Sequence, residues 1–222
     1  MEGKFIVMEG LDGSGKTTQL RLLEEHLLGK GLIVDMTAEP TVSALGGTLR
    51  DALSGFTPRT NCEIAALFAA DRVQHNVNPV WGIRKLLSQG RTVLCDRYYY
   101  SSMAYQGTLT DWEWVKSTNL NSPEIRKPDL CIFLDVDYER SMARMSSGNR
   151  VYLEIYENPK MLIATRKSYY RAFEELKDRD RIVIVDAARS IEEVAADVAA
   201  PPILFLNKLI LGIDKGRSDV LL

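Results

Sequence analysis

Gly10-Leu11-Asp12-Gly13-Ser14-Gly15-Lys16-Thr17 is the most informative segment of this sequence. It matches the pattern G-x-x-x-x-G-K-[ST] at every fixed position. A β-rich run at residues 5–8 precedes it, and apolar residues recur at helical spacing over residues 19–28. A strand, a glycine-rich turn and a helix in this order predict a loop whose backbone N–H groups surround a phosphate.

This loop predicts a nucleotide-binding site. Lys16 would reach the β- and γ-phosphates, and the Thr17 hydroxyl would ligate Mg²⁺. Such loops occur in GTPases, ATPase motors, switches and small-molecule kinases alike. A GTPase would need an Asn-Lys-x-Asp segment, but Asn207-Lys208 is followed by leucine and isoleucine, and the chain is short for a motor. The residues expected to bind ATP here are Gly10, Leu11, Asp12, Gly13, Ser14, Gly15, Lys16, Thr17 and Thr18.

Five β-rich runs alternate with helical stretches along the chain. Several of them are continuously apolar, as strands buried on both faces of a parallel sheet are. The order predicts an α/β domain with a doubly wound, parallel five-stranded sheet flanked by helices. Residues 63–87 predict a long helix or a broken pair, because Pro79 and Gly82 interrupt the pattern. The predicted strands are residues 5–8, 32–34, 92–95, 130–134 and 182–185.

Length and composition narrow the class of protein. The 222 residues predict one domain over 1–200, with a short mobile segment at about 145–156. We expect Pro201-Pro202 to end a helix, and 201–222 to form an apolar extension of the same domain. A net charge of −2 excludes the basic surface of a general nucleic-acid binder, and no apolar run approaches a membrane span. Three distant cysteines form no disulfide framework, which favours a cytoplasmic protein.

Several segments together resemble the thymidylate kinase family. Asp96-Arg97-Tyr98 follows the third predicted strand, and Phe68 and Arg72 form a Phe-x-x-x-Arg pair. The resemblance runs in order from about residue 4 to residue 198 and includes the phosphate loop. It implies a P-loop kinase that transfers the γ-phosphoryl group of ATP to dTMP, giving dTDP for dTTP synthesis. It also implies Mg²⁺ as cofactor and, commonly, a homodimer.

Two alternatives to this function stay open. The same fold could phosphorylate another acceptor, such as dUMP or a deoxynucleoside. A nucleotide-dependent switch would bind ATP and phosphorylate no small molecule. The acceptor residues implied by the resemblance distinguish these alternatives, because a switch has no need of them.

Asp96 is the predicted metal-binding carboxylate. It lies at the carboxyl end of a predicted strand, where open α/β sheets bind their ligands, and it would hold Mg²⁺ through water. Asp135 has the same context and is its competitor. We favour Asp96 because the adjacent Arg97 offers a planar guanidinium to an acceptor phosphate. In thymidylate kinases the corresponding arginine binds the dTMP phosphate, which implies this role for Arg97.

Phe68 and Arg72 lie on one face of a predicted helix. An aromatic at this spacing is usually a core residue, and a lone arginine is usually solvated. The resemblance implies instead that Phe68 stacks on thymine and that Arg72 donates to thymine O4. Tyr105 resembles the tyrosine that crowds the sugar 2′ position, with a packed core aromatic as the competing interpretation. Ser101, in the same segment, is also expected to contact the substrate.

Glu39-Pro40 resembles the family's loop after the second strand. A residue before proline favours an extended conformation, which suits a fixed loop. Many relatives carry arginine before Glu-Pro, whereas this chain has Ala38, so Arg50 on the following helix is the candidate substitute. Asp12 resembles the acidic residue near the acceptor sugar and the transferring phosphate. We therefore expect Asp12, Glu39, Pro40 and Arg50 around the acceptor.

The segment 145–156 resembles the lid that closes over ATP. Residues 12–14 of the phosphate loop include no basic residue, yet the charge on the migrating phosphoryl group must be neutralised. We therefore expect Arg150 of the lid to supply the catalytic cation, although Ile155 stands where relatives often have a further arginine. The residues expected to act in catalysis are Lys16, Asp12, Arg97 and Arg150.

The adenine side of the nucleotide is assigned by resemblance alone. Arg144 precedes the lid, and its family counterpart stacks on adenine. Ala188 lies in a late segment that also resembles the family, and we expect it to contact ATP.

Overall fold

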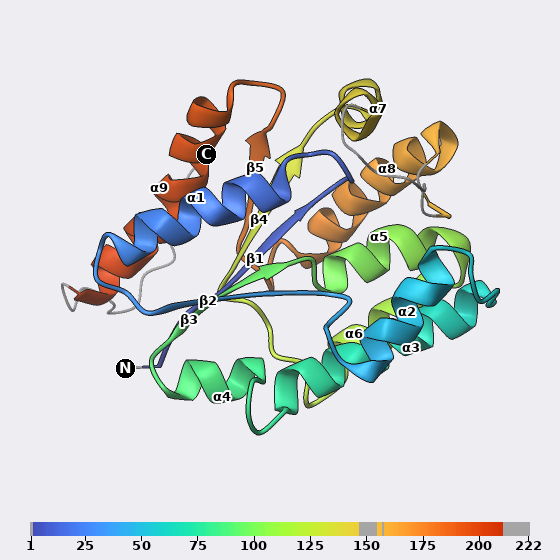
Figure 1. Cartoon of the computed structure of the whole chain (residues 1–222), viewed down its shortest axis with the longest axis horizontal. Helices are drawn as coiled ribbons and strands as arrows, with labels where there is room; N and C mark the ends of the chain where they lie inside the picture. The colour runs from blue at the N-terminus through green and yellow to red at the C-terminus, as the bar shows by residue number, and fades with distance from the viewer. Residues whose placement is uncertain (1, 147–154, 157, 211–222) are drawn as a thin grey trace.

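The computed structural model describes residues 2–146, 155, 156 and 158–210. In this part of the chain, helices enclose a central sheet on both faces (Figure 1). No helix among the described residues is both long and apolar enough to cross a membrane. The strands are β1 (Phe5–Gly10), β2 (Val34–Ala38), β3 (Thr92–Asp96), β4 (Leu130–Asp135) and β5 (Ile182–Asp186). The helices are α1 (Lys16–Leu28), α2 (Ala44–Leu53), α3 (Asn61–Val77), α4 (Ile83–Ser88), α5 (Tyr99–Leu109), α6 (Trp112–Leu120), α7 (Tyr138–Ser146), α8 (Pro159–Leu176) and α9 (Ile191–Ile210).

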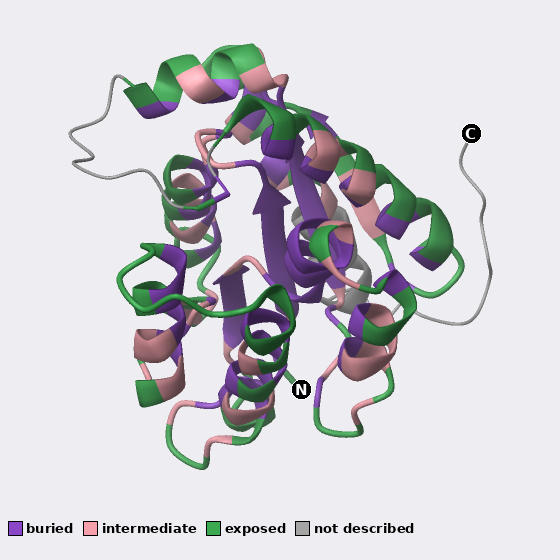
Figure 2. Ribbon diagram, turned by 90° about the vertical axis from the view of Figure 1, so that its right-hand side faces the viewer, coloured by how far each residue is buried: buried purple, intermediate pink, exposed green. Residues whose placement is uncertain are grey.

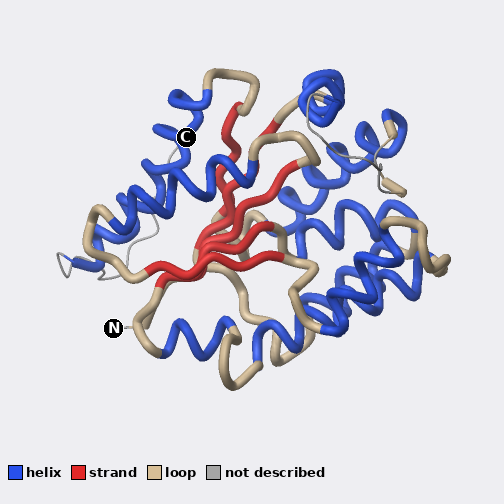
Figure 3. The backbone as a smooth tube through the Cα atoms, viewed as in Figure 1, coloured by secondary structure: helices blue, strands red, loops and turns tan. Residues whose placement is uncertain are grey.

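The sheet of the described chain has five parallel strands in the order β2-β3-β1-β4-β5, which confirms the predicted architecture (Figure 3). β1 lies at the centre, where Val7 pairs with Cys95 of β3 and with Cys131 of β4. The earlier strands lie on one side of β1 and the later strands on the other. The phosphate loop therefore leaves the sheet where its winding reverses, which is the ligand-binding position of such folds.

The two faces of β1 are buried under different sets of helices. Phe5 and Val7 belong to a core formed with residues of α3, α4, α5 and α8. Ile6 and Met8 belong to a second core, formed with residues of α1 and α9. All four side chains are fully buried, and Figure 2 shows the central strands as buried. Burial on both faces explains why this strand is continuously apolar in sequence.

Two boundaries differ from the expectations, and one open alternative is resolved. The second strand is Val34–Ala38 rather than 32–34, because β2 is an edge strand with polar and exposed residues and lacks an apolar run. Residues 63–87 form the broken pair α3 and α4, with Pro79 between them. The expected helix end at Pro201-Pro202 is wrong, because α9 continues to Ile210. Flanking alanine and leucine residues favour a helix there despite the proline pair. Residues 211–222 lie outside the described chain.

The start of α3 is fixed by a capping box. Thr60 Oγ1 accepts a hydrogen bond from the Glu63 backbone at 3.2 Å, and the Glu63 carboxylate accepts one from the Thr60 backbone at 2.8 Å. Reciprocal bonds of this kind satisfy two of the unpaired N–H groups of a helix start. The cap sets where the helix begins and so brings Phe68 and Arg72, one turn apart, to the same side of α3.

Candidate active site

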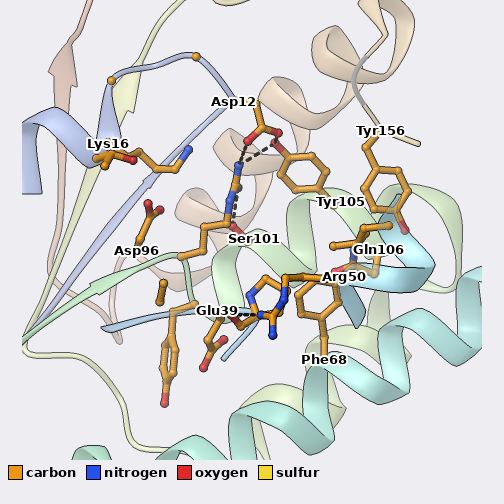
Figure 4. A pocket seen from close by; sticks show the side chains of 18 of the residues that line it. Asp12, Lys16, Glu39, Arg50, Phe68, Asp96, Ser101, Tyr105, Gln106 and Tyr156 are labelled. Atoms are coloured by element: carbon orange, nitrogen blue, oxygen red, sulfur yellow. Dashed lines mark hydrogen bonds and ion pairs between the residues drawn. The ribbon is translucent and has the colours of Figure 1, made fainter. Parts of the chain in front are cut away.

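A cavity of about 590 Å³ opens at the carboxyl ends of β1, β2 and β3. Figure 4 shows Lys16 and Asp96 at one side of this space and Phe68, Gln106 and Tyr156 at the other. The cavity thus brings together residues that are far apart in the sequence. The predicted site residues among its lining are Asp12, Gly13, Gly15, Lys16, Thr17, Thr18, Glu39, Pro40, Arg50, Phe68, Arg72, Asp96, Arg97, Ser101, Tyr105 and Arg144.

The phosphate loop holds Lys16 through its own backbone. Lys16 Nζ donates to the carbonyl oxygens of Gly10 (3.1 Å) and Leu11 (2.9 Å). Gly13 and Gly15 have φ angles of 77° and 98°, in the left-handed region that favours glycine. Burial lowers the pKa of Lys16. The ammonium group is therefore already placed at the loop, beside the N-terminus of α1.

A second cavity, of about 270 Å³, adjoins the first, and Arg144 borders both. Arg144 donates to the carbonyl oxygens of Ala187 (2.9 Å) and Ser14 (3.4 Å). Ala187 and Ser14 line this cavity, whereas Ala188 lies next to the lining and donates its N–H to Asp186. The two adjoining spaces give room for a nucleotide that extends from the phosphate loop past Arg144.

Arg97 and Asp12 form an ion pair at the cavity wall. Arg97 has a φ angle of 68°, which residues other than glycine rarely adopt. Its Nη2 lies 2.5 Å from Asp12 Oδ1, and its Nη1 donates to Ser101 Oγ at 3.0 Å. Tyr105 donates to Asp12 Oδ2 at 3.2 Å, and burial raises the pKa of Tyr105, so its phenol stays protonated. A cation, a carboxylate and a phenol thus face the same space.

Arg72 is anchored at the base of the cavity. Its side chain is only 1% exposed, and its Nε and Nη2 lie 2.8 and 2.7 Å from Glu39 Oε2. Nη1 donates to Ser102 Oγ at 3.1 Å. Phe68, one turn earlier on α3, is also buried and borders the cavity. Arg72 is therefore not a solvated arginine, because it is a buried cation paired with a carboxylate.

The loop after β2 carries Glu39 and Pro40 to the cavity. His75 Nδ1 lies 2.9 Å from Glu39 Oε1, so both oxygens of this carboxylate have partners on α3. Arg50 reaches back from α2 and donates to the carbonyl oxygens of Thr41 (2.6 Å) and Pro40 (3.2 Å). The side chain of Arg50, which belongs to α2, therefore reaches the loop that follows Ala38.

Asp96 fits a metal-binding role better than Asp135. Among the described residues, Asp96 Oδ1 is buried and accepts no hydrogen bond, and Asp96 lines the cavity together with Thr17. Both oxygens of Asp135 accept hydrogen bonds from Arg166 at 2.7 Å. The described chain holds no cluster of three or more His, Cys, Asp or Glu side chains suited to a metal ion. A site with few protein ligands suits Mg²⁺, which keeps several waters and binds substrate phosphates.

Three residues of this region are not among the predicted site residues. Gln106 and Tyr156 line the cavity; Gln106 follows Tyr105 and Tyr156 ends the expected lid, but neither has a role predicted from the sequence. Glu9 lies in β1 and is fully buried. A glutamate directly after the apolar run at residues 5–8 is itself a signal, because a glutamate that continues a buried strand needs hydrogen-bond partners. That signal could have identified Glu9 without a structure.

Arg150 lies outside the described residues, as do residues 147–154 of the expected lid. The ends of the segment are described. Ile155 donates its N–H to the carbonyl oxygen of Leu53 at 3.0 Å, and Tyr156 reaches the cavity. The C-terminal end of the expected lid is therefore attached to α2, on the side of the cavity that holds Arg50.

A phosphate loop that leaves the central strand and shares a cavity with an Arg–Asp pair suits a P-loop kinase of small phosphorylated acceptors. The family model described as thymidylate kinase matches residues 8–198. A probable thymidylate kinase of Pyrococcus horikoshii is 38% identical over 207 residues, covering 90% of this chain and 96% of that protein. A thymidylate kinase of Leifsonia xyli subsp. xyli is 38% identical over 202 residues, covering 88% and 92%. The chain belongs to the thymidylate kinase family and is an ATP-dependent nucleoside monophosphate kinase.

Proposed function

We propose that this chain transfers the γ-phosphoryl group of ATP to dTMP, giving dTDP, with dTMP bound between Arg97 and Phe68. The observation that carries the proposal is one cavity bordered by both Lys16 and Arg97. Two cations facing one space suit two phosphates brought together for transfer. Phosphoryl transfer asks little covalent chemistry of the protein, so positioning and charge neutralisation are its contributions.

ATP would occupy the phosphate loop and the second cavity. Lys16 would neutralise the β- and γ-phosphates, and residues 10–18 would donate backbone N–H groups at the start of α1. Arg144 borders both cavities, so its guanidinium would stack on adenine. Ala187 and Ala188 would lie at the edge of the base.

The sugar and phosphate of dTMP would lie against the Arg97–Asp12 pair. Arg97 would bind the acceptor phosphate, and Ser101 holds its guanidinium at 3.0 Å. Asp12 would lie near the acceptor sugar and the transferring group. Tyr105, hydrogen-bonded to Asp12, would crowd the 2′ position and so favour deoxyribose.

The thymine base would lie against α3. Phe68 would stack on the ring, and Arg72 would donate to O4, with Glu39 and Pro40 forming the adjacent loop. Because Glu39 pairs with Arg72, the guanidinium has a fixed orientation. Uracil shares O4, so dUMP remains the alternative acceptor, and this pocket distinguishes dTMP from dUMP least.

Thr17 and, through water, Asp96 would hold Mg²⁺, and the buried Asp96 oxygen without a hydrogen bond fits that role. When bound, Mg²⁺ neutralises charge on the β- and γ-phosphates. Arg150 would supply the further cation from the lid, because the phosphate loop has none besides Lys16.

We further propose a cytoplasmic homodimer. Members of the family are commonly homodimers, and Trp114, Val42 and Phe56 are exposed apolar side chains that a second subunit could cover. Cys62, Cys95 and Cys131 are unpaired, as in proteins of a reducing compartment. Residues 201–222 would extend the same domain.

Coupled ADP release with a panel of acceptors tests the function. We expect turnover with ATP–Mg²⁺ to be highest for dTMP, lower for dUMP and lowest for dCMP and thymidine. ADP release at the same rate with no acceptor present would favour a nucleotide-dependent switch. Preference for thymidine over dTMP would favour a deoxynucleoside kinase instead.

A further inference from the structure

Glu9 is a buried carboxylate that lies immediately before the phosphate loop. It belongs to β1, and none of its surface is exposed. Burial raises the pKa of Glu9, while hydrogen bonds and the charge of Arg97 oppose that increase. A glutamate is rarely buried so completely unless other groups satisfy its oxygens. What Glu9 does therefore depends on those groups.

Four hydrogen bonds converge on Glu9. Its Oε1 accepts from the backbone N–H groups of Tyr98 (2.8 Å) and Ser101 (3.2 Å). Its Oε2 accepts from the hydroxyls of Ser101 (2.6 Å) and Tyr169 (2.8 Å). The two N–H groups belong to the first turn of α5, in which Tyr98 is the N-cap residue. Glu9 thus caps a helix from a neighbouring strand.

This cap fixes the backbone on one side of Arg97. Tyr98 follows Arg97 directly, and the Arg97 N–H donates to the Met8 carbonyl at 2.9 Å. Both ends of Arg97 are therefore held by adjacent residues of β1. A non-glycine residue with a φ of 68° keeps that conformation only when its surroundings impose it. Met8 and Glu9 are those surroundings.

The hydroxyls that donate to Glu9 also hold the Arg97 side chain. Arg97 Nη1 donates to Ser101 Oγ at 3.0 Å and to Tyr169 OH at 3.4 Å. Ser101 Oγ and Tyr169 OH also lie 2.8 Å from each other, so the two hydroxyls and the Glu9 carboxylate share their hydrogens while both hydroxyl oxygens accept from the guanidinium. Glu9 therefore orients two of the groups that accept hydrogen bonds from Arg97.

We infer that Glu9 is a positioning residue for the acceptor phosphate, acting on Arg97 through Ser101 and Tyr169. The inference rests on the proposed role of Arg97 as a ligand of the dTMP phosphate. Because Glu9 also precedes Gly10, it connects the phosphate loop to the acceptor arginine and fixes their relative position. A carboxylate with only a structural role would support the thymidine and phosphate parts of dTMP alike. A positioning residue serves the phosphate alone.

Glu9→Gln tests this role with little change of shape, since it replaces one acceptor oxygen by an amide donor. Isothermal titration calorimetry on the full chain would give the Kd of dTMP, of thymidine and of ATP. We expect the dTMP Kd to rise about tenfold, as for loss of a hydrogen bond to a charged group. The thymidine and ATP Kd values should change by less than about twofold. Arg97→Lys should abolish most of the additional effect of Glu9→Gln, because both act on the same contact.

Tyr100→Phe is the matched control. It removes a buried hydroxyl from α5, the helix that Glu9 caps, but that hydroxyl donates to Asp180 at 2.8 Å and not to Glu9. We expect a lower melting temperature and an unchanged ratio of the thymidine Kd to the dTMP Kd. Tyr169→Phe removes one of the two linking hydroxyls and should weaken dTMP about threefold, again with thymidine unaffected.

Two outcomes would overturn the inference. Glu9→Gln could weaken dTMP and thymidine by the same factor, or it could change neither. If Glu9→Gln does not fold, the same comparison with Tyr169→Phe decides. An unmodified chain that fails to phosphorylate dTMP, or binds thymidine as tightly as dTMP, would instead contradict the proposed function.

Discussion

At the donor end of the cavity, Lys16 is held by two carbonyl oxygens of its own loop, whereas at the acceptor end Arg97 is held by side chains. Those side chains are Asp12 beside β1, Ser101 on α5 and Tyr169 on α8. The donor end is therefore a local structure, built by one contiguous segment. The acceptor end is a network that exists only when several elements are packed together.

This difference determines which properties a substitution should change: activity alone, or binding and stability as well. Removing Lys16 leaves the carbonyl groups of Gly10 and Leu11 without their donor, in a loop whose glycines still set its path. Removing a member of the acceptor network leaves a buried charge without its partner, and this destabilises a protein by about 3–5 kcal/mol. Donor-end variants should thus lose chemistry alone, and acceptor-end variants should lose binding and stability together.

The largest expected effect is that of Lys16→Ala. We expect kcat to fall roughly a hundred- to a thousandfold, because the donor phosphates lose a positioned cation. The Kd of dTMP and the melting temperature should stay close to those of the unmodified chain. Steady-state kinetics, calorimetry and thermal unfolding measure the three quantities. A large loss of stability would contradict this difference between the two ends of the cavity, since Lys16 would then hold more than its own loop.

Asp96→Asn should have the next largest effect. Loss of a metal-binding carboxylate should raise the Mg²⁺ concentration needed for half-maximal activity about ten- to a hundredfold. Asp135→Asn is the matched control, because Asp135 ends strand β4, on the other side of β1 from β3, and is paired with Arg166. The Mg²⁺ titration of that control should be unchanged. If Asp135→Asn alone shifts the titration, the metal is held at β4 and our assignment is wrong.

Substitutions of Arg72 and Phe68 test the part of the cavity proposed to bind thymine. Arg72→Ala should weaken dTMP and dUMP far more than dCMP, because cytosine presents an amino group where thymine presents O4. Since that variant also leaves Glu39 Oε2 without its partner, Arg72→Lys separates the two roles by keeping the charge. We expect Arg72→Lys to retain most stability and to lose about tenfold in kcat/KM for dTMP.

Phe68→Ala is the partner variant, and its effect should differ in kind. Stacking does not depend on the identity of the base, so all three monophosphates should weaken alike, by about 1–3 kcal/mol. Values of kcat/KM for dTMP, dUMP and dCMP on each variant measure both effects. Equal losses for the three acceptors with Arg72→Lys would show that Arg72 only supports the fold.

The same contrast explains what could be predicted from the sequence. The phosphate loop and four of the five strands were predictable, because a contiguous motif or a continuous apolar run encodes each of them. β2 was misplaced because an edge strand with polar residues has no such run. The identities of Arg97 and Arg72 came from a resemblance, and no local pattern states that Glu39 would neutralise Arg72 from 33 residues away.

Glu9 shows most clearly what could not be predicted from the sequence. Its partners Ser101 and Tyr169 lie 92 and 160 residues further along the chain, so only the packed fold brings them together. The sequence shows a glutamate directly after an apolar run, but it shows neither the burial of that glutamate nor its partners. Non-local networks of this kind have no spacing that a sequence pattern could detect.

The smallest expected effect is that of Arg50→Ala. Arg50 is an exception to the difference between the donor and acceptor ends. Arg50 lies at the acceptor end but is exposed and held by backbone carbonyls of the loop after β2, as Lys16 is held by its own loop. If Arg50 replaces the arginine that Ala38 lacks, its removal should raise the KM for dTMP about threefold and leave kcat unchanged. An exposed contact of this kind is worth little, and salt should weaken it further. The melting temperature should not change, because no buried charge loses a partner.

Arg59→Ala provides the control, since Arg59 is an exposed arginine paired with Glu63 away from the cavity lining. Kinetics at low and high salt measure the effect, and the difference between the Arg50 variant and the unmodified chain should shrink as salt increases. An unchanged KM at low salt would mean that Arg50 only fastens the loop and that this kinase binds the acceptor phosphate without it.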